Sequence, residues 1–306
     1  MVHIIPENLI VHLEWSSTAP APTKGKNITP TSVTVPSATG FTIEDLVMRG
    51  KEHYSEKKNK NDQNIGLALA LQKVNNYVGT SGMIATMPYL VAGKATAPKK
   101  NYLWKKWFSV LSEEHVVIDT QGTFVTAGNP VVITVHGRGI LTYDRIMKAY
   151  GEGLTPENAA QLTEDEAGSL LKGELPGGEN IQIYTPENVQ RGDIPNPFGH
   201  YAVVTDFEVA KATASGYHNK KDFMDNPLVH ARVGTLEYLE PYFKKAKHTD
   251  GTVASWHRFA EIDPAVPQGR VLCVDSTDNG LDGVDDLYSI GRFVGVVPEA
   301  PGARKK

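Results

Sequence analysis

The chain has 306 residues, of which 40% are hydrophobic and 22% charged, and its formal net charge is −4. This composition is typical of a globular protein and argues against wholesale disorder. The negative net charge argues against a protein held on nucleic acid by a general positive field. The single cysteine, Cys273, excludes an intrachain disulfide and argues against a cysteine-based zinc site.

The chain shows no apolar run as long as a membrane span, and its first residues lack the basic and apolar pattern of a secretory signal. We therefore expect a soluble protein that is cytoplasmic or part of an assembled particle.

Residues 1–40 are rich in Ser, Thr and Pro, with prolines at positions 20, 22, 30 and 36. Proline spacing of this kind disfavours helix and favours an extended arm. The same composition is found in solvated linkers and in arms that join subunits, and it does not separate the two. We expect three parts: an arm at 1–40, a mainly helical segment at 41–112, and an α+β domain at 113–306.

The segment 41–112 begins with two helix signals. Thr42 is a suitable N-cap followed by acidic residues, and residues 64–78 repeat apolar side chains at helical spacing.

An aromatic stretch then places Trp104, Trp107 and Phe108 at i, i+3 and i+4, which predicts an amphipathic helix over 104–111. Its aromatic face suits a core or a subunit interface equally well. Lysines between Lys99 and Lys106 alternate with these aromatics, a pattern also found in single-stranded nucleic-acid binders. The negative net charge makes packing the favoured interpretation.

The strongest strand signal is the β-branched run Val131–Val135, which predicts a strand buried on both faces. Gly137 and Gly139 permit a tight loop after it, and Thr142 is a suitable N-cap for a helix.

The loop 136–142 is our candidate enzyme site, because free N–H groups at a helix start bind anions and Arg138 adds further donors. We name His136, Arg138 and Asp275 as candidate catalytic residues for an enzyme acting on a small anionic substrate. The sequence contains no nucleophile elbow and no phosphate-binding loop, so a glycine turn with a surface Arg and a buried His is the favoured interpretation.

Further strands and helix starts predict an α+β fold with a central, mostly β-branched sheet and flanking helices. The expected strands are 115–119, 122–126, 181–184, 201–205, 271–274 and 293–297. The expected helices begin at Thr155, Thr163, Thr185, Asp206 and Thr235.

The polar stretch 275–286 is a candidate calcium loop, because its oxygen ligands surround a turn at Gly280. Alignment with an EF-hand-like loop puts Asp275, Asn279 and Asp286 at ligand positions. The flanking residues read as strands rather than helices, so a solvated Asp/Gly turn is favoured.

Two functional hypotheses follow. The first is a self-assembling structural protein, such as a shell, capsid or filament subunit, whose identical subunits exchange arms and bury aromatic surface. The second is the enzyme with its site at 136–142. The absence of a catalytic motif favours the first.

Overall fold

The computed structural model describes residues 40–176 and 178–299. The arm predicted at 1–40 therefore lies outside the described residues, apart from Gly40. The described residues belong to one compact unit. Within the described ranges, no helix combines the length and the apolar character that crossing a membrane requires.

The described part of the chain is built of helices and strands in mixed order, which confirms the α+β class. The helices are α1 (Ile43–Arg49), α2 (Gly66–Val78), α3 (Met87–Thr96), η2 (Tyr102–Trp104), α4 (Tyr143–Glu152), α5 (Glu164–Lys172), α6 (Pro186–Arg191), α7 (Phe207–Ala212), α8 (Lys220–Met224), α9 (Pro227–Val233) and α10 (Leu239–Ala246). The strands are β1 (Lys51–Ser55), β2 (Met83–Ile84), β3 (Phe108–Ile118), β4 (Pro130–His136), β5 (Ala160–Gln161), β6 (Glu174–Leu175), β7 (Glu179–Asn180), β8 (Gln182–Tyr184), β9 (Tyr201–Asp206), β10 (Gly216–His218), β11 (Val253–Trp256), β12 (Gln268–Val274), β13 (Leu281–Asp282) and β14 (Gly291–Val296).

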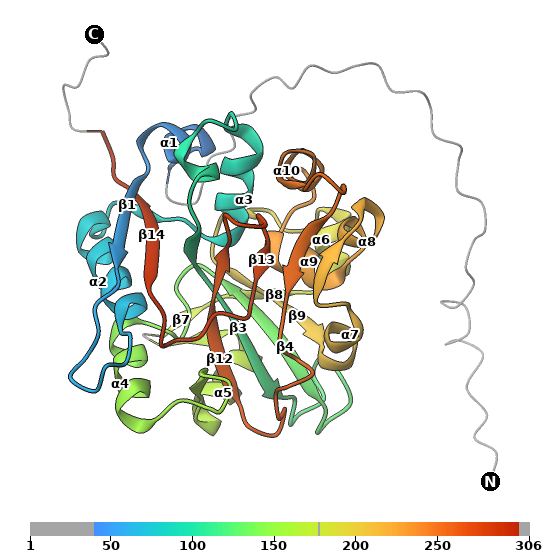
Figure 1. Cartoon of the computed structure of the whole chain (residues 1–306). Helices are drawn as coiled ribbons and strands as arrows, with labels where there is room; N and C mark the ends of the chain where they lie inside the picture. The colour runs from blue at the N-terminus through green and yellow to red at the C-terminus, as the bar shows by residue number, and fades with distance from the viewer. Residues whose placement is uncertain (1–39, 177, 300–306) are drawn as a thin grey trace, which may run out of the picture. The chain divides into compact units, whose positions relative to one another are not determined.

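A small sheet in the order β1-β14-β2 joins the two ends of the described chain. Strands β1 and β14 pair antiparallel from Lys51↔Gly295 to Ser55↔Gly291, and α2 packs beside them (Figure 1). The strand predicted at 293–297 therefore belongs to this small sheet, and its place in the central sheet was predicted wrongly. The boundary predicted at 112/113 falls inside β3, so it does not separate two parts of the fold.

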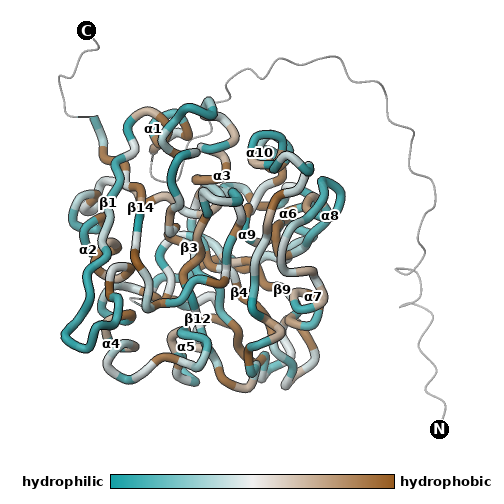
Figure 2. The backbone as a smooth tube through the Cα atoms, viewed as in Figure 1, coloured by the Kyte–Doolittle hydropathy of each residue, from teal (hydrophilic) through white to brown (hydrophobic). Residues whose placement is uncertain are grey.

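The larger sheet has the order β10-β11-β13-β12-β3-β4-β9-β8, with β5 paired to β12. The predicted strand at 131–135 is confirmed as β4, an interior strand between β3 and β9. Val131 and Ile133 pack on one face with residues of α5, whereas Val132 packs on the other with residues of α7 and α9. Figure 2 shows brown, apolar stretches in strands of the interior, whereas the outer loops are mainly teal. Burial on both faces is the reason for the uninterrupted β-branched run.

Three predicted helix starts are confirmed by their hydrogen bonds. Thr42 and Thr163 each form a capping box, and the Thr142 side chain accepts from Arg145 N. Thr185 and Asp206 also precede helices, as predicted. Local capping chemistry needs no distant partner, which is why the sequence reveals it.

The helix predicted over 104–111 is wrong. The chain forms only the short helix η2 and then extends into β3 at Phe108, where it pairs with Val274 of β12. The ring of Trp104 stacks on Tyr242 of α10 at 5.7 Å. Strand pairing and this packing outweigh the local helical spacing.

Three further predictions are corrected. Residues 122–126 form a loop held by Asp119 rather than a strand. Thr155 starts a turn and not a helix, because its N–H donates to Ala159 O. The helix predicted from Thr235 begins later, at Leu239. Pro241 then lies in the first turn of the helix, where a proline does not force a kink.

Helices α3 and α9 were not predicted. Every residue of α3 from Met87 to Ala95 is buried, and so is every residue of α9 from Leu228 to Val233. A helix that is buried all round has no polar face, and the alternation that marks an amphipathic helix is then missing from its sequence.

Candidate functional site

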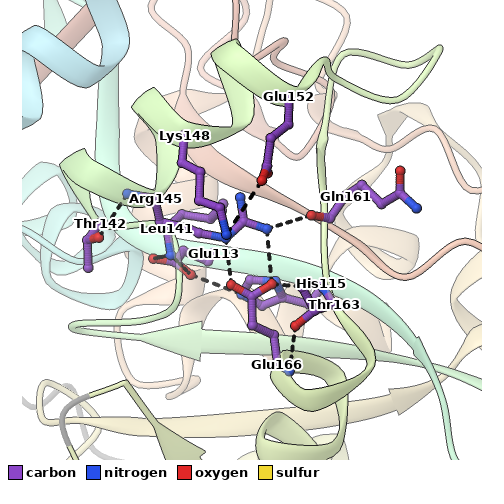
Figure 3. A network of polar contacts seen from close by, with 10 residues as sticks. All are labelled: Glu113, His115, Leu141, Thr142, Arg145, Lys148, Glu152, Gln161, Thr163 and Glu166. Atoms are coloured by element: carbon purple, nitrogen blue, oxygen red, sulfur yellow. Dashed lines mark hydrogen bonds and ion pairs between the residues drawn. The ribbon is translucent and has the colours of Figure 1, made fainter.

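The loop after β4 is tied down from inside the protein. Glu113, which is buried on β3, accepts the N–H of Leu141 at 3.1 Å on one carboxylate oxygen and 3.0 Å on the other (Figure 3). A Cβ at Gly139 would collide with this carboxylate, which explains the glycine. The carboxylate of Glu113 therefore lies at the loop before α4, where the sequence suggested that an anion could bind.

An ion pair holds α4 on its outer side. Arg145 donates to Glu166 at 2.5 and 3.0 Å and to the carbonyl of Gln161 at 2.6 Å (Figure 3). Glu166 also caps its own helix through Thr163. These contacts hold α4 and α5 together and leave neither side chain free for catalysis.

His136 is a structural residue in this fold. Its side chain is fully buried, and its ring nitrogens lie 2.9 Å from Ser112 Oγ and 2.8 Å from Ala231 O. Burial lowers the pKa of His136 to about 4, so the ring is neutral near pH 7. His115 lies on the opposite face of β3 from Ser112, the register partner of His136, so the two histidines do not face each other.

The three candidate catalytic residues are not brought together. Arg138 is exposed in the loop after β4, whereas His136 points into the core. Asp275 follows β12 and belongs to a different cluster of side chains. No triad of nucleophile, base and anion-binding group forms among them.

The cluster that contains Asp275 is the candidate metal site. One carboxylate oxygen from each of Asp275, Asp278 and Asp282 lies within 4.8 Å of the others. Asp278 and Asp282 are buried, and Asp275 is half-buried. A Cβ at Gly280 would lie 2.7 Å from Asp278 Oδ1 and 3.0 Å from Asp282 Oδ1, so the two oxygens flank this glycine.

Asp282 has an oxygen without a partner. Its Oδ1 forms no hydrogen bond with the described residues although the atom is buried, and its Oδ2 accepts only from Cys273 Sγ at 3.8 Å. Burial, and then the negative charges of Asp278 and Asp285, raise the pKa of Asp282 well above its usual range. An unpartnered oxygen among like charges is typical of a group that awaits a proton or a cation.

Lys94 of α3 lies beneath this cluster. Its side chain is fully buried, and its ammonium donates to Asp275 O at 3.2 Å. Burial lowers the pKa of Lys94 to about 7, although the charges of Asp275 and Asp278 oppose that change. The charge of Lys94 therefore offsets only part of the negative charge of the carboxylates.

Of the two carboxylates predicted as calcium ligands, the structure brings Asp275 into the cluster but not Asp286. Asp286 pairs instead with Arg258 at 3.0 Å. Asn279 lies in the left-handed region with φ of 52°, and its amide donates to Ala246 O. Asp278 and Asp282 were not predicted, because their convergence depends on the bend of the chain between β12 and β13.

Cys273 is buried under the same loop. Burial, and then nearby carboxylates such as Asp285, raise the pKa of the thiol well above its usual range. A thiol that stays protonated is a poor nucleophile, so the surroundings of Cys273 favour an inert, buried side chain.

The cluster suits a hard cation, because all its ligand atoms are carboxylate oxygens. Two oxygens on opposite sides of Ca²⁺, each at about 2.4 Å, are about 4.8 Å apart. Three oxygens within 4.8 Å of one another are close enough to share one Ca²⁺, and water would complete the coordination.

An aromatic platform borders the acidic cluster, formed by Tyr217, Trp256 and His248. Tyr217 is 53% exposed, and its ring centroid lies 5.6 Å from Trp256 and 5.4 Å from His248. Trp256 Nε1 donates to Asp278 Oδ2 at 2.7 Å, and His248 Nε2 contacts Asp278 O at 3.1 Å. Asp278 therefore links the exposed aromatic surface to the cluster of carboxylates.

The aromatic residues predicted at an interface lie mostly inside the chain. Trp104 and Phe108 are buried, and Trp107 is half-buried beneath the guanidinium of Arg292 at 4.9 Å. Within Lys99–Lys106, Lys99 covers the Trp104 ring at 4.1 Å. These rings are thus not arranged as an exposed stacking surface.

Comparison with solved structures yields a match to a protein of Nanoarchaeota in which the C-type lectin fold accommodates massive sequence variation. The two chains are 26% identical with a TM-score of 0.59, over 82% of this chain and 99% of the other. The fold of this chain is similar to that structure. No protein-family model matches the chain, and no curated protein matches it.

Proposed function

We propose that this chain is a calcium-dependent binding protein whose ligand contacts the aromatic platform and the adjacent acidic cluster. The observation that carries the proposal is the convergence of Asp275, Asp278 and Asp282, with a buried, unpartnered oxygen on Asp282. Calcium would neutralise these carboxylates and fix the loop between β12 and β13.

The exposed ring of Tyr217 supports recognition rather than catalysis. A large aromatic side chain that stays 53% exposed offers contact area at low cost in conformational entropy. The similar Nanoarchaeota protein supports the same view, because a fold that accommodates massive sequence variation can keep its core while its surface residues change.

The functions expected from the sequence remain proposals. Self-assembly into a shell, capsid or filament depends on the arm at 1–40, which lies outside the described residues apart from Gly40. The enzyme acting at 136–142 has no assembled catalytic group in the part of the chain that the structure describes. A measurement of particle mass with and without residues 1–39 tests the first of these.

The proposal is tested by isothermal titration of the full chain with CaCl₂ after treatment with EDTA. We expect one binding event per chain, accompanied by a change in tryptophan fluorescence because Trp256 bonds to Asp278. Asp282→Asn should weaken binding about tenfold or more, since one charged ligand is lost. Asp286→Asn is the matched control and should bind as the wild type does, because Asp286 pairs with Arg258.

A chain that does not bind calcium at millimolar concentration contradicts the proposal. Loss of binding in the Asp286 variant, with none in the Asp282 variant, would instead favour the EF-hand-like ligand set. A second test applies the chain to arrayed glycans and peptides in calcium or EDTA. Binding that requires both calcium and Tyr217 supports the recognition role, and Tyr217→Ala should leave calcium affinity unchanged.

A further inference from the structure

A separate pocket of about 270 Å³ lies where the end of α2, strand β2, the start of α3 and the loop after β4 meet. It shares no residue with the acidic cluster or the aromatic platform. Met83, Leu111 and Phe198 give it an apolar wall, and Thr86, Arg138 and His200 give it a polar one.

The N-terminus of α3 faces this pocket. Thr86 is the N-cap of the ten-residue helix, but its side chain caps no backbone N–H. Its hydroxyl is buried and has no hydrogen-bond partner among the described residues, while the residue as a whole is 6% exposed. A buried hydroxyl without a partner costs free energy, and a ligand in the pocket would satisfy it.

The polar wall contains an arginine without a partner among the described residues. The Arg138 side chain is exposed and forms no ion pair or hydrogen bond with any of them. Glu179 also lines the pocket, but its carboxylate contacts His200 Nδ1 at 2.7 Å, and His200 Nε2 contacts Arg138 O at 2.5 Å. The Arg138 guanidinium is therefore available to an anion, and the helix start adds positive potential.

Gly137 keeps His200 in this position. It has φ of 94°, and a Cβ there would lie 2.8 Å from the His200 ring. The loop that follows β4 thus shapes the pocket wall. The end of this loop, just before α4, is occupied by the carboxylate of Glu113.

We propose that this pocket binds a small organic carboxylate, with its carboxylate between Arg138 and Thr86 and its apolar part against Met83, Leu111 and Phe198. A guanidinium matches a carboxylate through two parallel hydrogen bonds, and the Thr86 hydroxyl supplies a third donor. Met83, Leu111 and Phe198 add an apolar wall, which inorganic anions do not exploit.

The test uses the full chain in EDTA, so that its outcome does not depend on calcium. Benzoate is titrated by saturation-transfer NMR and by thermal shift, with benzamide as the neutral match and inorganic phosphate as an anion without an apolar part. We expect benzoate to bind with Kd of about 1 mM, and the other two compounds at least about tenfold more weakly.

Two variants locate the binding. Arg138→Gln should weaken benzoate binding about tenfold or more, whereas Arg191→Gln, which changes another exposed arginine, should leave it unchanged. Thr86→Val should weaken it about threefold without lowering the melting temperature of the free protein, because the Thr86 hydroxyl has no partner among the described residues. Equal binding of benzoate and benzamide, no binding at about ten times the expected Kd, or an unchanged Arg138→Gln variant would each overturn the proposal.

Discussion

Arg232 and Glu114, which are 118 positions apart in sequence, form a fully buried bidentate ion pair with both N–O distances at 2.9 Å. The pair connects α9 to the middle of β3. Arg232 also donates to Leu281 O at 2.7 Å and to Ser255 Oγ at 3.2 Å. The same guanidinium therefore holds β13, the strand that contains Asp282.

Breaking this pair should destabilise the protein strongly. Glu114→Leu or Arg232→Met alone leaves one buried charge without its partner and should cost about 3–5 kcal/mol of unfolding free energy. The double variant should cost clearly less than the sum of the two single variants. Urea unfolding measures all three, with Arg191→Gln as the exposed-pair control, expected to cost under about 1 kcal/mol. Additive costs would contradict a direct interaction.

Calcium affinity should rise with pH. The pKa of Asp282 lies above its usual range, and that of Lys94 is about 7. At lower pH, calcium must therefore displace a proton from Asp282 and is repelled by the charged ammonium of Lys94. The unliganded protein loses stability as pH rises through the raised pKa of Asp282, and calcium removes this loss. The increase in melting temperature caused by calcium should thus be larger at pH 8 than at pH 6. Lys94→Met should raise affinity mainly at pH 6; an effect independent of pH would contradict this view.

Stability should fall in mild acid because of His136. Its pKa is lowered to about 4 from the usual 6.5, so the unfolded chain takes up the proton first as pH falls from 6.5 to 4. This difference amounts to about 3 kcal/mol of unfolding free energy. Urea unfolding at pH 7.5 and 4.5 should show a larger loss for the wild type than for His136→Gln. Parallel losses in the two proteins would assign the acid sensitivity to other groups.

Asp119 should be the main support of the loop 120–129. Its carboxylate accepts the N–H groups of Gly122, Phe124 and Val125 at 2.7–3.1 Å. Burial opposes ionisation, but these hydrogen bonds outweigh it and lower the pKa of Asp119. Asp119→Asn should cost about 1–3 kcal/mol near pH 7 and expose the loop to limited proteolysis. Because the stabilisation is lost as pH falls through the lowered pKa, the wild type and the variant should converge in strong acid.

Local signals in the sequence were sufficient for elements whose cause is local. The β-branched run Val131–Val135 predicted a doubly buried strand, and the caps at Thr42, Thr142 and Thr163 marked true helix starts. Each of these depends on the conformational preference of a few neighbouring residues or on hydrogen bonds within one turn.

The candidate site required the tertiary structure. Asp275 was named from the sequence, but Asp278 and Asp282 take their places only where the chain turns back to pair β13 with β12. Lys94 reaches the cluster from a helix with no polar face, and Trp256 reaches Asp278 from another strand. Glu113 of the neighbouring strand accepts the N–H of Leu141 just before α4, a contact that no local pattern in the sequence indicated.

By itself, the sequence determined the α+β class, the central strand and the helix starts at Thr42, Thr142 and Thr163, because propensity and capping act over a few residues. Only the tertiary structure decided that 104–111 is not a helix, that the two ends of the described chain pair as β1 and β14, and which carboxylates converge. These outcomes are set by contacts between residues far apart in the chain, and spacing along a sequence carries no information about such distances.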